Sequence, residues 1–225
     1  MCGRFSRFTG IDSIQDRYDL KTIIELESNY NTSPQDEAVV ILRSDINHSQ
    51  NMIWGFLPFW SKTRTISNKT INARSDSLEK KYFKHSFEQK RCIIPVNGFF
   101  EWNSRTKQPY YIHHADNELF SFAGLYDIWK SNMGEVVNSF TIITTKANET
   151  IKQIHDRMPV IIDKEYEEQW LDHTTSISKL NSILSTPTMQ PLNLYSVSSF
   201  VNSPKNKGIK CIEPISEQNS LSNYF

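Results

Sequence analysis

The chain of 225 residues has few of the residues that define several common classes of site. It contains 3 cysteines, Cys2, Cys92 and Cys211, and their odd number and wide separation argue against a disulfide framework. No Cys-x-x-Cys pair indicates zinc. The 7 glycines form no glycine-rich loop of the kind that cradles phosphates. We therefore expect neither a metal ion nor a cofactor.

Long hydrophobic runs and an excess of one charge are also missing. The chain begins with no apolar signal region and contains no run near membrane-spanning length, which predicts a protein without membrane association, in the cytoplasm or nucleoid, or in the nucleus if the source is eukaryotic. Three scattered thiols fit such a reducing compartment. Lysine and arginine (25) balance aspartate and glutamate (25), so any surface for nucleic acid must be local.

Hydrophobic residues make up 38% and aromatic residues 12% of the chain, enough to build a core. Strand patterns outnumber helix patterns, which predicts an α+β fold with a single domain over residues 2–212, a curved or barrel-like mixed sheet and short flanking helices. Residues 213–225 read as a tail with little to bury. Strands are expected at 37–43, 51–56, 91–102, 109–113, 119–129, 136–145, 158–162 and 194–197, helices at 11–20, 75–81, 83–90, 148–154, 164–171 and 177–184, and a turn at 29–34.

Among what is present, Cys2 stands out because it follows the initiator methionine directly. Removal of Met1 would leave Cys2 with a free α-amine and a thiol on neighbouring carbons. The amine has a reference pKa of about 7.7–8.0, so part of it is unprotonated at neutral pH. An amine condenses with an aldehyde to a Schiff base, on which the thiol can close to give a thiazolidine ring. The alternative is a buried N-terminal residue without chemistry.

Six short segments follow one another along nearly the whole chain. They are MCGRF at 1–5, YNTSP at 30–34, WGFLPFW at 54–60, INARSD at 71–76, RCIIPVNGFFEW at 91–102 and HDRMPV at 155–160. This ordered set resembles the SRAP family, the SOS-response-associated peptidases, and the likeness extends to CIEP at 211–214. The resemblance implies a protein that crosslinks itself to abasic sites in single-stranded DNA and removes its own Met1.

Four residues are the catalytic candidates. The nucleophile is Cys2, and opening the cyclic sugar to its aldehyde requires general acid–base catalysis. Glu101 is the lone carboxylate among apolar neighbours that would raise its pKa, although a solvent-facing Glu is the alternative. His155 titrates near neutrality, and a solitary His is otherwise structural. Asn72 could hold the N-terminal amine or the sugar.

The DNA-binding candidates are three arginines, two tryptophans and a proline. Arginine grips phosphate with a bidentate fork, whereas most arginines form surface ion pairs. Aromatic rings stack on bases of single strands, so Trp54 and Trp102 are expected to face DNA, while Phe56, Phe59 and Trp60 are assigned to the core. The remaining candidates are Arg4, Arg74, Arg157 and Pro34, the last as a wedge in a turn.

The end of the chain, QNSLSNYF at 218–225, resembles the PIP box, a peptide that binds sliding clamps. One 3-10 turn would bring Leu221 and Tyr224 to the same side for an apolar pocket, with Gln218 in a polar one and Phe225 beside Tyr224. The alternative is that the last two aromatics dock on their own domain. We expect a monomer whose partners are abasic single-stranded DNA and a replication clamp.

Two other functions compete with the DNA crosslinker. An N-terminal-nucleophile hydrolase such as a glutamine amidotransferase also exposes a cysteine after loss of Met1 and uses the α-amine as base. A non-catalytic clamp adaptor would need the tail and not Cys2. The crosslinker hypothesis additionally leaves room for slow strand cleavage through a Schiff base.

Overall fold

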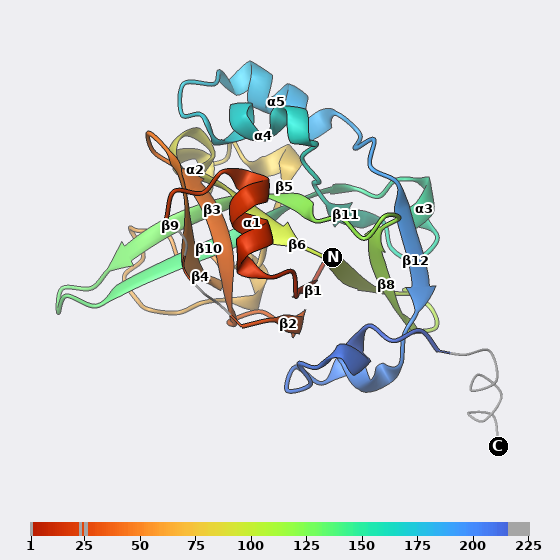
Figure 1. The fold of residues 1–225 in the computed structure, drawn as a ribbon. Coiled ribbons are helices and arrows are strands. Elements are labelled where there is room, and N and C mark those ends of the chain that lie inside the picture. Colours follow the sequence, from red (N-terminus) through yellow and green to blue (C-terminus); the bar gives the residue numbers. More distant parts are fainter. Residues whose placement is uncertain (1, 23, 25–26, 216–225) are drawn as a thin grey trace.

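The computed structural model describes residues 2–22, 24 and 27–215 (Figure 1). The strands are β1 Arg4–Arg7, β2 Asn29–Thr32, β3 Glu37–Arg43, β4 Asn47–Trp54, β5 Asn72–Arg74, β6 Arg91–Val96, β7 Gly98–Trp102, β8 Pro109–His114, β9 Phe120–Lys130, β10 Val136–Lys146, β11 Arg157–Pro159 and β12 Leu192–Ser196. The helices are α1 Ile11–Tyr18, α2 Lys84–Gln89, α3 Glu149–Lys152, α4 Lys164–Leu171 and α5 Ile177–Ser185, with 3-10 turns η1 Asn68–Thr70, η2 Ser75–Ser77, η3 Ser199–Asn202 and η4 Ile209–Cys211.

The strands form two sheets. One has the order β12-β8-β7-β1-β2, and the other runs β11-β10-β4-β3-β6-β9 with β5 attached to β10. Strand β9 also pairs with β10, so β10, β4, β3, β6 and β9 close into a ring. The contact between β10 and β4 is parallel, whereas β9 and β10 are antiparallel. The expected α+β fold with one domain and a barrel-like mixed sheet is confirmed.

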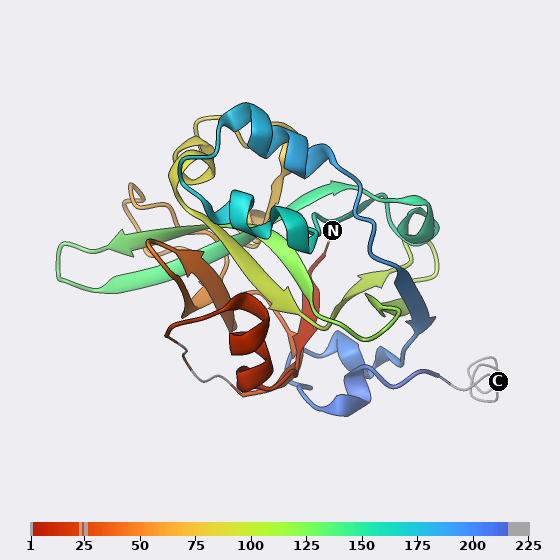
Figure 2. The same cartoon turned by 45° about the horizontal axis from the view of Figure 1, so that its top comes forward.

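Short helices cover the outside of these sheets (Figure 2). Helices α4 and α5 pack together, and Trp170 of α4 donates its indole N–H to the carbonyl of Cys92 in β6 at 2.9 Å. The Arg91 guanidinium is buried and donates to the carbonyls of Trp170 and Asp172, which ties the end of α4 to the same strand. On another side, a C-terminal segment with η3 and η4 lies beside β2.

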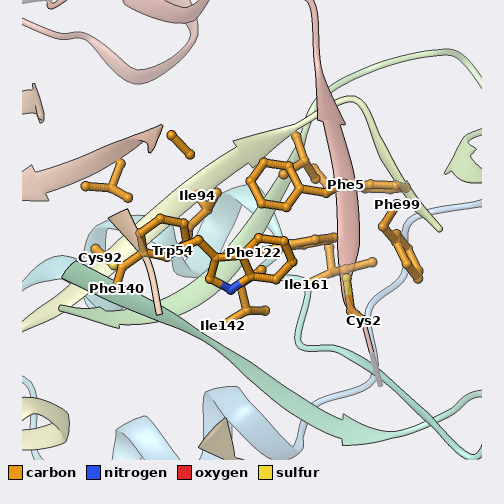
Figure 3. Packing of buried hydrophobic residues seen from close by; sticks show 14 of the residues in the cluster. Cys2, Phe5, Trp54, Cys92, Ile94, Phe99, Phe122, Phe140, Ile142 and Ile161 are labelled. Atoms are coloured by element: carbon orange, nitrogen blue, oxygen red, sulfur yellow. The ribbon is translucent and has the colours of Figure 1, made fainter. Parts of the chain in front are cut away.

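One of two large apolar clusters joins residues of both sheets (Figure 3). Trp54, Phe122 and Phe140 lie within it and are fully buried. Phe5 of β1 packs on Trp54 with ring centroids 5.0 Å apart. Cys2 belongs to the same cluster and lies at one margin of it in this view. The core therefore reaches the first residue that the structure describes.

Several local expectations were wrong. The first strand, β1, was not expected, and residues 29–34 contain strand β2, with the turn confined to Pro34 and Gln35. The sheet provides the reason, because β2 is short and gains its partner only when β1 pairs with it. The helix expected at 75–81 is reduced to η2, and the run at 91–102 divides into β6 and β7.

We predict that Gly98→Ala destabilises the fold. A Cβ at this position would lie 2.6 Å from the backbone oxygen of Ile112 and 2.5 Å from the ring of Tyr111. Relief of such a clash requires backbone shifts, which cost about 1–3 kcal/mol in free energy of unfolding. Urea denaturation measures this, with Gly208→Ala as the control because a Cβ there meets nothing within 4 Å. Equal midpoints for both variants would contradict the prediction.

Candidate active site at the amino terminus

Cys2 is held at the junction of the two sheets. Gly3 alone separates it from β1, which pairs with β7 in a register that sets Arg4 opposite Phe100. Glu101, the next residue of β7 after Phe100, lies close enough for its carboxylate to act on the Cys2 thiol. From the other sheet, Asn72 of β5 donates its Nδ2 hydrogen to the Cys2 carbonyl at 2.8 Å. The start of the chain is therefore fixed from both sides.

The Cys2 side chain is fully buried. Its Sγ lies 3.5 Å from the carbonyl oxygen of Arg4, to which the thiol donates. Burial raises the pKa of the thiol, and the nearby Glu101 carboxylate raises it further because a thiolate would be repelled. The resting thiol is thus neutral. The burial assumed by the inert alternative is observed, but that alternative explains neither polar neighbour, Glu101 or Asn72.

Glu101 is only 2% exposed, so the alternative of a solvent-facing strand Glu is wrong. Burial raises the pKa of its carboxyl to about 7. A carboxyl with this pKa exchanges its proton easily at neutral pH, which is the property required of a general acid–base group. Its field also acts on the thiol of Cys2, so the two groups are electrostatically coupled.

Asn72 is buried, and its two side-chain atoms differ in their contacts. Nδ2 is used for the Cys2 carbonyl, whereas no described residue donates to Oδ1. A buried amide oxygen without a donor costs about 1–3 kcal/mol, so such an atom marks a place where another donor is bound. The Oδ1 of Asn72 thus offers an acceptor beside the Cys2 backbone.

His155 lies between α3 and β11 and is half-buried. The backbone N–H of Arg157 donates to its Nδ1 at 3.0 Å, which sets the proton of the neutral ring on Nε2. Asp156 Oδ1 also lies 3.0 Å from Nδ1, a contact that is favourable only when that nitrogen carries a proton. Burial lowers the pKa of His155, so at neutral pH the neutral ring dominates, with Nδ1 accepting from the Arg157 N–H. The ring can accept a proton and then pair with Asp156.

Arg74 and Arg157 lie on the β5–β11 side of the site and act on each other's charge. Arg74 is exposed and forms a two-point ion pair with Asp76, its Nη2 2.7 Å from Oδ2. Arg157 is mostly buried, with Nη2 bonded to the backbone oxygen of Thr144 at 2.6 Å. Of these two arginines, Arg74 has its guanidinium at the surface. There it would exchange the Asp76 carboxylate for a phosphate.

Arg4, Trp102 and Pro34 lie on the side of the five-stranded sheet and are all partly exposed. Arg4 donates to Asn31 Oδ1 and to the backbone oxygens of Val201 and Asn202. These three positions remain candidates for contact with DNA.

The aromatic assignments need correction. Trp54 is 0% exposed and donates its indole N–H to the Ile71 carbonyl at 2.9 Å, so it is a core residue and not a stacking platform. Phe56 is buried as expected. Phe59 and Trp60, assigned to the core, are 50% and 52% exposed. Phe59 and Trp60 lie in a turn that Pro58 begins, its carbonyl accepting from the backbone N–H of Ser61 at 2.9 Å, and a proline is a turn signal that the sequence contained.

Phe59 and Trp60 line a shallow apolar hollow together with Tyr82, His85 and Lys81. Trp60 meets Tyr82 edge-to-face with centroids 5.5 Å apart, and Phe59 meets His85 at 5.3 Å. Phe56, three residues before Phe59, lies beside the chain that leads into β5, because its backbone N–H donates to the carbonyl of Thr70, two residues before Asn72.

The tail positions Gln218, Leu221, Tyr224 and Phe225 lie outside the described residues, so clamp binding stays a prediction. Within residues 2–22, 24 and 27–215 no group of three or more His, Cys, Asp or Glu side chains is arranged to hold a metal ion. In the same part of the chain, no helix has the length and apolarity required to cross a membrane.

Comparison with known proteins agrees with this geometry. The family described as SOS response associated peptidase (SRAP) matches residues 1–204. The chain belongs to the SRAP family. It is 39% identical to the abasic site processing protein YoaM of Bacillus subtilis, over 95% of this chain and 98% of that protein. It is 33% identical to the abasic site processing protein HMCES of Xenopus tropicalis, over 84% of this chain and 67% of that one.

A solved structure shares the fold. The crystal structure of a protein from Bacteroides thetaiotaomicron superposes with a TM-score of 0.86 at 30% identity, covering 96% of this SRAP chain and all of the other.

We predict that Glu101→Gln stabilises the protein at alkaline pH. Because the folded-state pKa of Glu101 is raised, the native state binds more protons than the unfolded state between about pH 4.5 and 7, and stability falls over that window as pH rises. The amide removes this loss, for which the shift sets an upper bound of about 3 kcal/mol. Thermal unfolding of both proteins at pH 5 and pH 8 measures it. A variant less stable than the parent at pH 8 would contradict the assignment.

Proposed function

We propose that this protein recognises abasic sites in single-stranded DNA and traps them covalently through Cys2 after loss of Met1. The observation that carries the proposal is the convergence on Cys2 of Asn72, at 2.8 Å from its carbonyl, and of Glu101, a buried carboxyl with a pKa near 7. The relatives named abasic site processing proteins support the choice of lesion.

The first step uses the α-amine of mature Cys2. The amine nitrogen attacks C1′ of the open-chain sugar aldehyde, and the carbinolamine then loses water to give an imine. Sugar ring opening and dehydration each need a proton to be delivered to oxygen, which Glu101 in its acid form supplies. His155 takes up a proton on the other side of the site, paired with Asp156. Asn72 Oδ1 accepts a hydrogen bond from the amine and directs its lone pair.

The second step closes the ring. The Cys2 sulfur adds to the imine carbon, forming the C–S bond, while the thiol proton passes through Glu101 to the nitrogen. The overall reaction joins an aldehyde and an aminothiol to a thiazolidine and one water, with no redox change. The high pKa of the thiol means that the amine reacts before the sulfur. Without the sulfur, the imine remains open to β-elimination and strand cleavage.

The surroundings of Cys2 supply the binding of DNA. Arg74 and Arg4 would bind phosphates, and the exposed rings of Phe59 and Trp60 would offer a surface on which bases stack. The protein would act where single-stranded DNA occurs, as a monomer, with the tail at 218–225 recruiting it to a sliding clamp. The proposed release of Met1 belongs to the same site, since it creates the amine.

We predict that Cys2→Ala abolishes the denaturation-resistant adduct. The variant retains an α-amine and can form only a hydrolysable imine, so it should give slow strand cleavage in place of a stable crosslink. Denaturing gels and mass spectrometry of protein incubated with an abasic oligonucleotide measure both products. Cys211→Ala is the matched control, because its thiol is buried away from the amine.

An equally stable adduct with Cys2→Ala would refute the crosslinking chemistry. Cys2-dependent release of ammonia from glutamine, without an adduct, would instead support the amidotransferase alternative.

We predict that Trp60→Ala weakens binding to single-stranded DNA. The ring is 52% exposed, and loss of one base–aromatic stack costs about 1–3 kcal/mol, or roughly 5- to 150-fold in Kd. Fluorescence anisotropy with a labelled oligonucleotide measures it. Met133→Ala is the control, since Met133 is 96% exposed at the tip of the β9–β10 hairpin. Equal losses in the two variants would argue against stacking.

A further inference from the structure

Every second residue of the turn at 57–61, which carries the exposed rings of Phe59 and Trp60, is held through its backbone by a side chain of the β9–β10 hairpin. The three bonds are Leu57 N–H to Ser139 Oγ at 2.9 Å, Phe59 N–H to Asp127 Oδ2 at 2.9 Å, and Trp129 Nε1–H to the Ser61 carbonyl at 2.8 Å. Asp127 and Trp129 are two apart in β9, and Ser139 is the antiparallel partner of Asp127, so all three side chains lie on one face of the hairpin. The turn therefore lies along this face of a hairpin that projects from the rest of the molecule (Figure 1).

Asp127 is the centre of this arrangement, because it is a buried carboxylate with donors on both oxygens. Oδ2 accepts from Phe59, whereas Oδ1 accepts from Lys90 Nζ at 2.5 Å and from the backbone N–H of Ile128 at 2.8 Å. A buried charge is tolerated when it is paired and hydrogen-bonded in this way. Because only 1% of Asp127 is exposed, it touches no ligand itself, and whatever it contributes passes through its partners.

The same carboxylate also acts on the ring of Phe59. Lys90 Nζ lies 5.3 Å from the centroid of that ring, within the range of a cation–π interaction. Asp127 thus fixes the backbone of Phe59 directly and its ring through Lys90. Trp60 follows in the same turn, and its ring meets Tyr82 edge-to-face. The orientation of both exposed rings therefore depends on how the hairpin holds the turn.

We propose that Asp127 is a positioning residue for single-stranded DNA, because it fixes the turn at 57–61 so that Phe59 and Trp60 are oriented for bases before DNA binds. The inference rests on the proposed function. Aromatic side chains on an unconstrained turn would lose conformational freedom on binding, and this ordering lowers affinity. A turn that is already fixed by the hairpin avoids that loss.

The test compares wild type with Asp127→Asn in binding an undamaged single-stranded oligonucleotide, measured by fluorescence anisotropy. Asparagine offers one acceptor oxygen in place of two, so either Phe59 or Lys90 loses its acceptor. We expect Kd to rise about 3- to 20-fold, within the roughly 5- to 150-fold that a complete base–aromatic stack contributes. Glu167→Gln is the matched control and should bind as wild type, because Glu167 is a buried carboxylate of α4 that is paired with Arg17 at 2.6 Å.

Crosslinking to an abasic oligonucleotide separates positioning from general damage to the protein. For Asp127→Asn, the DNA concentration that gives half the maximal rate should rise by the same factor as Kd. The maximal rate should stay within about twofold of wild type, because the stacking surface binds DNA equally before and during the reaction. A purely structural disturbance that reached Cys2 would lower the maximal rate.

A background without the rings tests the route of the effect. In a Phe59→Ala/Trp60→Ala protein, which lacks both stacking rings, Asp127→Asn should add no further loss of affinity, because the two changes act on the same contact.

Trp129→Phe provides a second test that preserves the charge pair. This variant keeps a ring and loses the N–H that donates to the Ser61 carbonyl, so Kd should rise about 2- to 10-fold, the effect of one neutral hydrogen bond. Trp170→Phe is its control, because it loses an indole N–H bonded to a backbone carbonyl at 2.9 Å, that of Cys92, on the α4 side of the protein. Trp129→Phe decides the test if Asp127→Asn does not fold.

The proposal is overturned by wild-type affinity in Asp127→Asn, or in Trp129→Phe where that variant decides. It is also overturned if Asp127→Asn costs as much in the protein without both rings, or if that protein binds DNA as wild type does. Failure of the proposed function is distinct, because wild type would then form no Cys2-dependent adduct, while affinity for undamaged DNA would still respond to Asp127→Asn.

Discussion

The hydrogen bond from Asn72 Nδ2 to the Cys2 carbonyl is the interaction on which the site depends. Chain termini are normally poorly ordered, because their ends have no neighbour on one side. Here β1 belongs to the five-stranded sheet and β5 is attached to the seven-stranded assembly, so this contact joins the two sheets at the first described residue. An α-amine exposed on Cys2 by the proposed loss of Met1 would therefore be held by the core of the protein, which gives the geometric precision that effective molarity requires.

Holding the terminus at the junction of the two sheets buries ionisable groups, and their burial costs free energy of folding. Burial disfavours ionisation of Glu101, and the Glu101 carboxylate in turn disfavours ionisation of the buried Cys2 thiol. Arg157 keeps its guanidinium on Thr144 and mostly out of water. A sequence selected only for stability would replace Glu101 by a residue that does not ionise. The retained penalty is consistent with a site that moves protons, because perturbed pKa values concentrate at functional positions.

The sequence alone indicated much of the fold and part of the site. Alternating patterns predicted the strand-rich α+β domain, and the motif positions of Cys2, Asn72 and Glu101 are those that meet. Prediction from the sequence failed where strand formation or burial depends on residues that are distant along the chain. β1 and β2 are short and form because they pair with each other, and β1 also pairs with β7. Trp54 is buried because Phe5 and Phe140 lie against it, whereas Trp60, six residues later, is exposed after a proline. Asn202 lies 100 residues from Trp102, and no local pattern links them.

Burial of the thiol bears on how the proposed crosslinking reaction would select its target. An exposed N-terminal cysteine would condense with any free aldehyde, since amine and sulfur are both available. In this site the sulfur faces the apolar cluster, and only an aldehyde carried to the amine and held there can meet it. A sugar within a DNA strand is held by its two flanking phosphates and bases, whereas a small aldehyde has no such attachments. Groups on both sides of Cys2, Arg74 on one and Arg4 with Trp102 on the other, would then contribute to selectivity as well as to affinity, because they keep the lesion in place until the ring closes.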